Sequence, residues 1–132
     1  MSAHYHAIVW IDHLEARIFQ FNADAVDRLV LRPHDPTRHI RHKVNTTGSG
    51  HAAEDYAFFR DVAAAIAGAG AVLVTGPAHT KTELLKYIEA HAPHLVRTIV
   101  GVETVDHPTD RELVAHARTF FKADDRMHAQ RQ

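Results

Sequence analysis

A basic, histidine-rich segment that leads into a glycine loop is the part of this sequence best suited to chemistry. Residues 28–43 carry five Lys and Arg side chains against one carboxylate, a net of +4, although the formal charge of the whole chain is −1. A polar loop at 45–51 follows and contains Gly48 and Gly50. Because glycine permits backbone conformations in which successive amides converge, such a loop in front of a helix can hold a phosphate or a carboxylate. We therefore expect an anion site here.

The residues of the predicted RNA- or anion-binding site take two roles. Lys and Arg neutralise backbone phosphates, and a histidine beside them supplies a titratable donor or a base. His51 is the one candidate for a catalytic group, and no recognised catalytic constellation accompanies it in the sequence. The predicted site consists of Arg38, Arg41, His42, Lys43, Gly48, Ser49, Gly50 and His51. The structural alternative is a flexible connection in which Ser49 caps the following helix.

A second stretch, residues 75–82, has the placement of a phosphate-binding loop because it follows a predicted strand and begins a predicted helix. Its glycine spacing is not that of a P-loop, so nucleotide hydrolysis is not expected. Lys81 in this stretch is a secondary candidate for anion binding, since ligands of α/β sheets collect at the carboxyl ends of the strands. The alternative for Lys81 is a solvated first-turn residue or a structural contact.

Acidic and histidine side chains raise two metal-dependent alternatives. Asp12, Glu15 and Asp106 lie near predicted strand ends, where carboxylates could hold two magnesium ions for phosphodiester cleavage. Asp12 is better explained as a turn residue with Glu15 as its partner. Histidines that could bind a transition metal are His4, His6, His34, His39 and His42. They lack a carboxylate or thiolate at diagnostic spacing, so we expect no physiological metal and no cofactor.

The elements that must position these residues follow from hydrophobic periodicity. Apolar or alternating runs predict strands, and a period of 3.6 residues predicts helices. The predicted strands are 6–11, 16–21, 26–32, 71–75 and 98–105, and the predicted helices are 52–67, 80–91 and a last one through 121. The first strand is apolar on both faces and should be central, with the strand at 71–75 parallel to it. Alternation over 40–44 predicts an extension of the meander or an edge ribbon.

Local signals refine the helices. The Thr-x-x-Glu pattern at 80–83 and again at 109–112 predicts a capping box at the start of each of the last two helices. In the first helix, Tyr56, Phe59 and Ile66 recur at helical spacing and predict a buried apolar face.

This order of elements predicts an α/β fold in a single domain, 1–132. An antiparallel meander is followed by parallel strand-helix units in one mixed sheet, which helices cover. The 132 residues, 45% of them hydrophobic, suffice for one core, and 123–132 should form a flexible tail. With no cysteine, disulfides and thiol chemistry are excluded. Without a signal-peptide pattern or an apolar run near the roughly 20 residues that span a bilayer, we expect a cytoplasmic protein with no membrane contact.

Three motifs in order resemble the central domain of archaeal and eukaryotic peptide-chain release factors and of Pelota-type ribosome-rescue factors. They are the hairpin sequence VWIDHLEARI at 9–18, the glycine loop before a helix, and VLVTGP at 72–77 followed by Lys81. Over about residues 5–122 the chain resembles more closely the small, stand-alone bacterial relatives known as translational machinery proteins. The resemblance implies an RNase H-like fold, an RNA-binding role in translation, and the ribosome or tRNA as partner.

One departure from the release factors concerns activity. In those factors the loop carries Gly-Gly-Gln, which enters the peptidyl transferase centre to assist hydrolysis of peptidyl-tRNA. Here the loop reads Gly48-Ser49-Gly50-His51 and contains no glutamine, and the domains that read stop codons or bind partners are not expected. The departure favours a protein that is not an enzyme.

Three functions from different classes therefore stand. The first, which we expect, is a translation-associated module that binds the ribosome or tRNA. The second is a hydrolase of peptidyl-tRNA or a related ester that uses the loop at 48–51. The third is a regulatory homo-oligomer whose meander edge pairs with a second copy.

Overall fold

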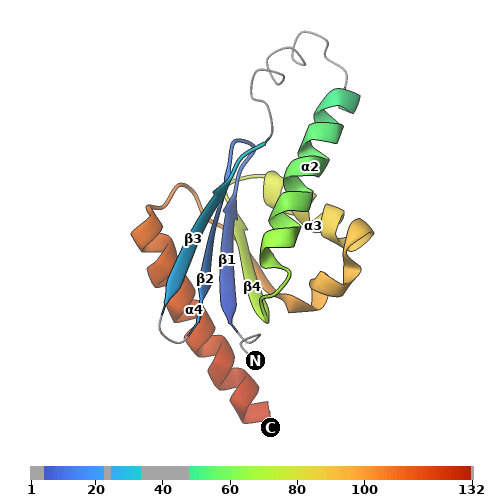
Figure 1. The fold of residues 1–132 in the computed structure, drawn as a ribbon. Helices are drawn as coiled ribbons and strands as arrows, with labels where there is room; N and C mark the ends of the chain where they lie inside the picture. Colours follow the sequence, from blue (N-terminus) through green and yellow to red (C-terminus); the bar gives the residue numbers. More distant parts are fainter. Residues whose placement is uncertain (1–4, 23–24, 34–47, 132) are drawn as a thin grey trace.

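Within the described residues, five strands form one mixed sheet in the order β3-β2-β1-β4-β5 (Figure 1). The structure is a computed structural model; it describes residues 5–22, 25–33 and 48–131, of which 48–55 and 124–131 are described by their backbone alone. The strands are β1 (His6–Ile11), β2 (Ala16–Phe21), β3 (Val26–Leu31), β4 (Ala71–Gly76) and β5 (Ile99–Thr104). The first three pair antiparallel as a meander, and β4 is parallel to both β1 and β5. The predicted fold class is confirmed.

β1 is the central strand, as its sequence predicts. All of its residues from Ala7 to Ile11 are buried. Because side chains alternate along a strand, Val9 and Ile11 belong to one part of the core, and Ile8 and Trp10 belong to the other. β1 therefore separates two apolar layers, which explains why it is apolar on both faces.

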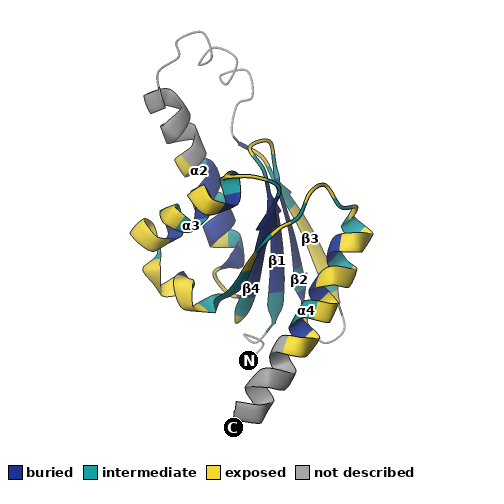
Figure 2. Ribbon diagram, turned by 180° about the vertical axis from the view of Figure 1, so that it is seen from behind, coloured by how far each residue is buried: buried dark blue, intermediate teal, exposed yellow. Residues whose placement is uncertain are grey.

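Helices cover both faces of the sheet (Figure 2). They are α2 (Gly48–Ile66), α3 (Thr80–His91) and α4 (Asp110–Arg131), with a short 3-10 helix η1 (Pro93–Thr98) after α3. The buried side chains of α2 and α3 pack on the face that contains Val9, and those of α4 pack on the face that contains Trp10. None of the helices in the described ranges is long and apolar enough to cross a bilayer.

α2 begins at Gly48, four residues earlier than predicted. The stretch Gly48-Ser49-Gly50-His51 is therefore the first turn of a helix, and the prediction of a loop over these residues is wrong. Glycine and serine are poor helix formers, which is why propensity places the boundary later. The predicted alternation at 40–44 lies outside the described residues.

The two predicted capping boxes have different outcomes. At α4 the box is confirmed, because the Thr109 amide donates to Glu112 Oε1 at 2.8 Å and the Glu112 amide donates to Thr109 Oγ1 at 3.1 Å. At α3 it is wrong: the N-cap is His79, in a helical conformation and without a side-chain cap, so Thr80 is already inside the helix. α4 continues to Arg131, through most of the predicted tail; the flexibility of that tail stays a prediction.

Candidate nucleic-acid interface

The carboxyl ends of four strands and the amino ends of α2, α3 and α4 lie at one edge of the molecule. β1, β3, β4 and β5 all run in the same direction, so Ile11, Leu31, Gly76 and Thr104 end at this edge. The chain leaves β3 here and returns here to begin α2 (Figure 1). Ligands of open α/β sheets bind outside the carboxyl ends of the strands. The fold therefore brings the end of β3 and the start of α2, the described elements on either side of 34–47, to the edge where binding is expected.

The structure places the residues of the predicted site only in part. Arg38, Arg41, His42 and Lys43 lie outside the described residues. Gly48, Ser49, Gly50 and His51 form the first turn of α2. The first amides of a helix have no intrahelical acceptor, and the helix dipole places partial positive charge there. Gly48 to His51 thus lie at a helix amino terminus, a place that attracts anions in proteins, and anion binding by these residues stays a prediction.

Lys81 is buried, with 8% of its surface exposed. Its Nζ donates to the carbonyl oxygen of Ala78 at 2.7 Å, so the ammonium group bonds the connection between β4 and α3. The geometry corresponds to the structural contact among the sequence-based alternatives, and not to a solvated first-turn residue. A role for Lys81 in anion binding stays a prediction.

An arginine network that sequence reasoning missed occupies the same edge. The guanidinium of Arg17 lies over the ring of Trp10, 4.5 Å from its centroid, and Nη1 donates to Asp110 Oδ1 at 2.8 Å. Arg28 Nε donates to the other carboxylate oxygen of Asp110 at 2.7 Å. The signal in the sequence is the single charge in the strand ARIFQF, opposite Trp10 in the register. Asp110 cannot be identified as its partner without the topology.

This network changes the charge that the sequence assigns to the edge. Arg28 pairs with Asp110, and Arg32 Nη2 lies 3.3 Å from Glu15 Oε1. The two cations of 28–43 that the structure describes therefore both have carboxylate partners within the domain. The remaining three, Arg38, Arg41 and Lys43, are the ones that the sequence assigns to phosphate binding.

Asp12 is a turn residue, as the sequence predicts. Its Oδ1 accepts hydrogen bonds from the amides of Leu14 and Glu15 at 2.9 and 3.0 Å. Its Oδ2 lies 3.8 Å from His107 Nε2, while His107 Nδ1 lies 3.0 Å from Asp106 Oδ1. Glu15 turns instead toward Arg17 and Arg32, so the three carboxylates of the nuclease alternative do not converge.

The structure tests the alternative of a transition-metal site only in part. Within the described part of the chain, no group of three or more His, Asp or Glu side chains is arranged to hold a metal ion. His4, His34, His39 and His42 lie outside the described residues. His6 stacks on Phe121, with ring centroids 4.4 Å apart and planes 11° from parallel.

The pKa of Asp110 gives the arginine network a pH dependence. The hydrogen bond from Arg17 holds the pKa of this carboxyl below its ordinary value of 3.8, against the opposing effect of burial, and Arg28 lowers it further. A group whose pKa is lower in the folded than in the unfolded state stabilises the fold above its unfolded pKa. That contribution is lost as pH falls through the lower, folded pKa.

We expect Asp110→Asn to lower the free energy of unfolding at pH 7 by about 2 kcal/mol, between the effects of exposed and buried ion pairs. The Asp110 side chain is 41% exposed and Arg17 is buried, which places the pair between these limits. Urea unfolding at pH 7 and pH 3 measures the difference, which should shrink at pH 3. Asp27→Asn, at an exposed position of β3, is the control. An equal difference at both pH values would contradict the network.

The fold of this chain is shared with domains of larger proteins. Pelota of Archaeoglobus fulgidus superposes with a TM-score of 0.64 at 14% identity, over 95% of this chain and 35% of that one. An archaeal translation termination factor gives 0.55 at 15% identity, over 96% and 40%. Pelota of Thermoplasma acidophilum gives 0.54 at 12% identity, over 81% and 30%. The chain thus spans less than half of each neighbour, and at these identities the likeness is one of fold.

Sequence comparisons add no family assignment. No protein-family model matches the chain, and no curated protein matches it. The expected resemblance in fold to Pelota and to release factors is therefore supported by structure alone.

Proposed function

We propose that this chain is a translation-associated RNA-binding module whose partner is the ribosome or tRNA, and that it acts in the cytoplasm. The observation that carries the proposal is that β3 ends and α2 begins at the carboxyl edge of a sheet shared with a translation termination factor, so the basic residues lie between two described elements of this edge in the sequence. This edge is the usual binding edge of such sheets. The fold supports a role in translation, and the basic segment supports RNA as the ligand.

The charges at this edge favour a contact with phosphates. Arg28 and Arg32 are held by Asp110 and Glu15, and we assign Arg38, Arg41 and Lys43 to the RNA backbone. The amides in the first turn of α2 lie where the described chain resumes after β3, and they can donate hydrogen bonds to one further phosphate. Such contacts are independent of sequence, so the affinity should depend on salt more than on the identity of the bases.

The triple replacement of Arg38, Arg41 and Lys43 by alanine tests the proposal. We expect the affinity for labelled tRNA to fall on the order of tenfold or more at low salt, because three phosphate contacts and their released counterions are lost. The slope of log affinity against log salt should become shallower by about two to three. Fluorescence anisotropy over a range of salt concentrations measures both quantities.

A matched control removes three exposed cations from other surfaces, by replacing Arg97 of η1 and Arg118 and Lys122 of α4 with alanine. The net charge changes equally in the two triple variants. If both lose the same affinity, binding follows the overall charge and the proposed interface is wrong.

Ester hydrolysis is the alternative for the same place in the fold, because His51 belongs to the first turn of α2. Turnover of peptidyl-tRNA by the purified protein, lost in His51→Ala, would favour the hydrolase. A homo-oligomer that pairs through β3, an edge strand of the sheet, stays a prediction and is tested by sedimentation.

A further inference from the structure

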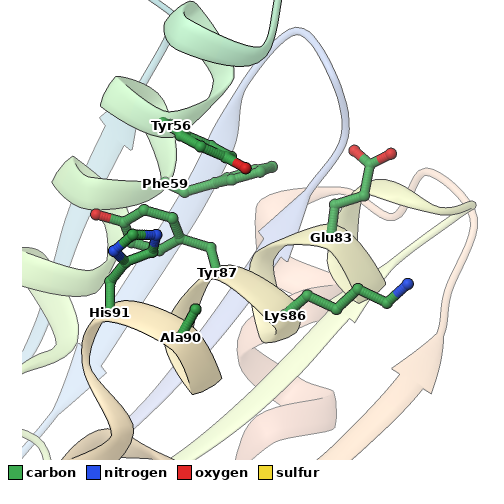
Figure 3. A pocket seen from close by; sticks show the side chains of 7 residues that line it. All are labelled: Tyr56, Phe59, Glu83, Lys86, Tyr87, Ala90 and His91. Carbon is green, nitrogen blue, oxygen red and sulfur yellow. The ribbon is translucent and has the colours of Figure 1, made fainter.

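Residues of α2 and α3 line an open hollow, and none of them belongs to the arginine network or to the predicted anion site (Figure 3). Its volume is about 290 Å³. We name it the aromatic hollow, and the residues that matter to it are Tyr56, Phe59, Glu83, Lys86, Tyr87 and His91. Figure 3 shows the rings of Tyr56 and Phe59, from α2, beside those of Tyr87 and His91, from α3.

Aromatic rings lie together around this hollow, and some of them are not buried in the core. Tyr87 and His91 stack with centroids 4.5 Å apart and planes 29° from parallel. The ring centroid of Tyr56 lies 5.7 Å from that of Tyr87 and 5.9 Å from that of His91. Phe59 is buried, but Tyr56 is 52% exposed although it continues the same apolar face of α2. The result is a set of flat surfaces that solvent can reach.

We propose that the aromatic hollow stacks an unpaired nucleobase of RNA. Base–aromatic stacking tolerates any base, because each base has a π-face. The carboxylate of Glu83 can accept from an exocyclic amino group, as acidic side chains do from cytosine, and Lys86 can contact the adjoining phosphate. The volume lies just below the roughly 300–1,000 Å³ of small-molecule sites, which suits one flat group.

The position of the hollow favours RNA over a peptide. Tyr56 follows Gly48 by eight residues of α2, or about 12 Å along the helix axis. A strand with a phosphate at the first turn of α2 can therefore place a nearby base over Tyr56. A helical peptide would need a longer groove, with anchors spaced over two turns. This inference rests on the proposed function, because it names the RNA feature that the same interface would recognise.

The test compares single-stranded RNA with a duplex of the same sequence, since pairing removes the free base face. The wild-type protein should prefer the single strand. Tyr56→Leu keeps an apolar side chain but removes the ring. It should weaken binding of the single strand at least about fivefold, the equivalent of ~1 kcal/mol for one stack. Its affinity for the duplex should not change. Tyr56→Trp should retain the preference, because it keeps an aromatic ring. Unchanged duplex binding by Tyr56→Leu would show that its loss is not a folding defect.

Controls separate the two proposals. Val102→Ala, at an exposed position on β5, should change neither affinity. The triple variant at 38, 41 and 43 should weaken both RNAs alike, which would leave the preference intact. If Tyr56→Leu keeps the wild-type preference, the base site is overturned and the proposed function stands.

Cytidine monophosphate probes the hollow without the rest of the interface. Shifts of the Tyr56 and Tyr87 ring protons in NMR spectra would support the base site, even if the protein bound no long RNA and the proposed function failed. Absence of these shifts at millimolar nucleotide, or shifts produced by a proline-rich peptide and not by the nucleotide, would overturn it.

Discussion

Gly76→Ala is expected to lower the free energy of unfolding by about 3 kcal/mol or more, at the upper end of the cost of overpacking. A Cβ atom at this position would lie 2.3 Å from the carbonyl oxygen of Ile11. That oxygen belongs to the backbone of β1, so no rotation of a side chain relieves the clash. The Gly76 carbonyl also accepts from the Val105 amide at 3.0 Å, which ties the end of β4 to the residue that follows β5. The ends of β1 and β4 would have to separate.

Urea unfolding followed by the fluorescence of Trp10 measures this effect. Gly101→Ala is the matched control on β5, because its Cβ would lie 3.0 Å from Leu73 Cδ1 and from Phe120 Cζ, both of which are side-chain ends that can move. We expect it to cost about 1 kcal/mol. Equal losses in the two variants would show that the backbone contact at Gly76 is relieved more easily than its geometry indicates.

Local patterns in the sequence predict the strands well. The bounds of β1 and β2 agree with the prediction, and the other three strands differ by no more than one residue at each end. The apolar face of α2 is largely confirmed, since Phe59 and Ile66 are buried. Tyr56 is the exception, and its 52% exposure depends on how far α3 covers α2. Packing between helices decides that extent, and hydrophobic periodicity does not describe it.

The two Thr-x-x-Glu patterns show that a local sequence pattern does not by itself determine whether a capping box forms. Both predict a capping box, and only the one at α4 forms. At α3 the short connection after Gly76 brings His79 into a helical conformation, with φ −82° and ψ −16°. A side-chain cap requires a residue outside the helical region, so Thr80 cannot act as one. The difference arises from the connection to β4, which the four residues of the pattern do not encode.

The candidate site divides in the same way. Residue type and spacing predict a basic segment, and the fold places the end of β3 and the start of α2, which flank it in the sequence, at the edge where binding is expected. Residue type and spacing do not predict that Arg28 and Arg17 share the carboxylate of Asp110, because Asp110 is 93 positions from Arg17 in the sequence. Partners of this kind follow from the crossing of the chain between β5 and α4. The charge that a segment can offer to a ligand is known only after its ion-pair partners within the domain are found.

Trp10→Ala is expected to lower the free energy of unfolding by about 3–5 kcal/mol, the usual cost of removing a buried aromatic side chain. Trp10 is 1% exposed at the end of β1. Its Nε1 donates to the carbonyl oxygens of Val105 and Asp106 at 3.2 and 2.8 Å, and its ring lies beneath the guanidinium of Arg17. The side chain therefore joins β1 to the connection between β5 and α4 and also supports the arginine network.

Trp10→Phe separates packing from hydrogen bonding. It keeps an aromatic ring under Arg17 but removes the donor to two carbonyl oxygens, and we expect a loss of about 1–3 kcal/mol. Urea unfolding followed by far-UV circular dichroism measures both variants, since the fluorescence probe is lost. A double-mutant cycle with Asp110→Asn should show coupling for Trp10→Ala, because both changes act on Arg17. Strict additivity would mean that the ring does not hold Arg17 in place for Asp110, and that the network owes its geometry to the ion pairs alone.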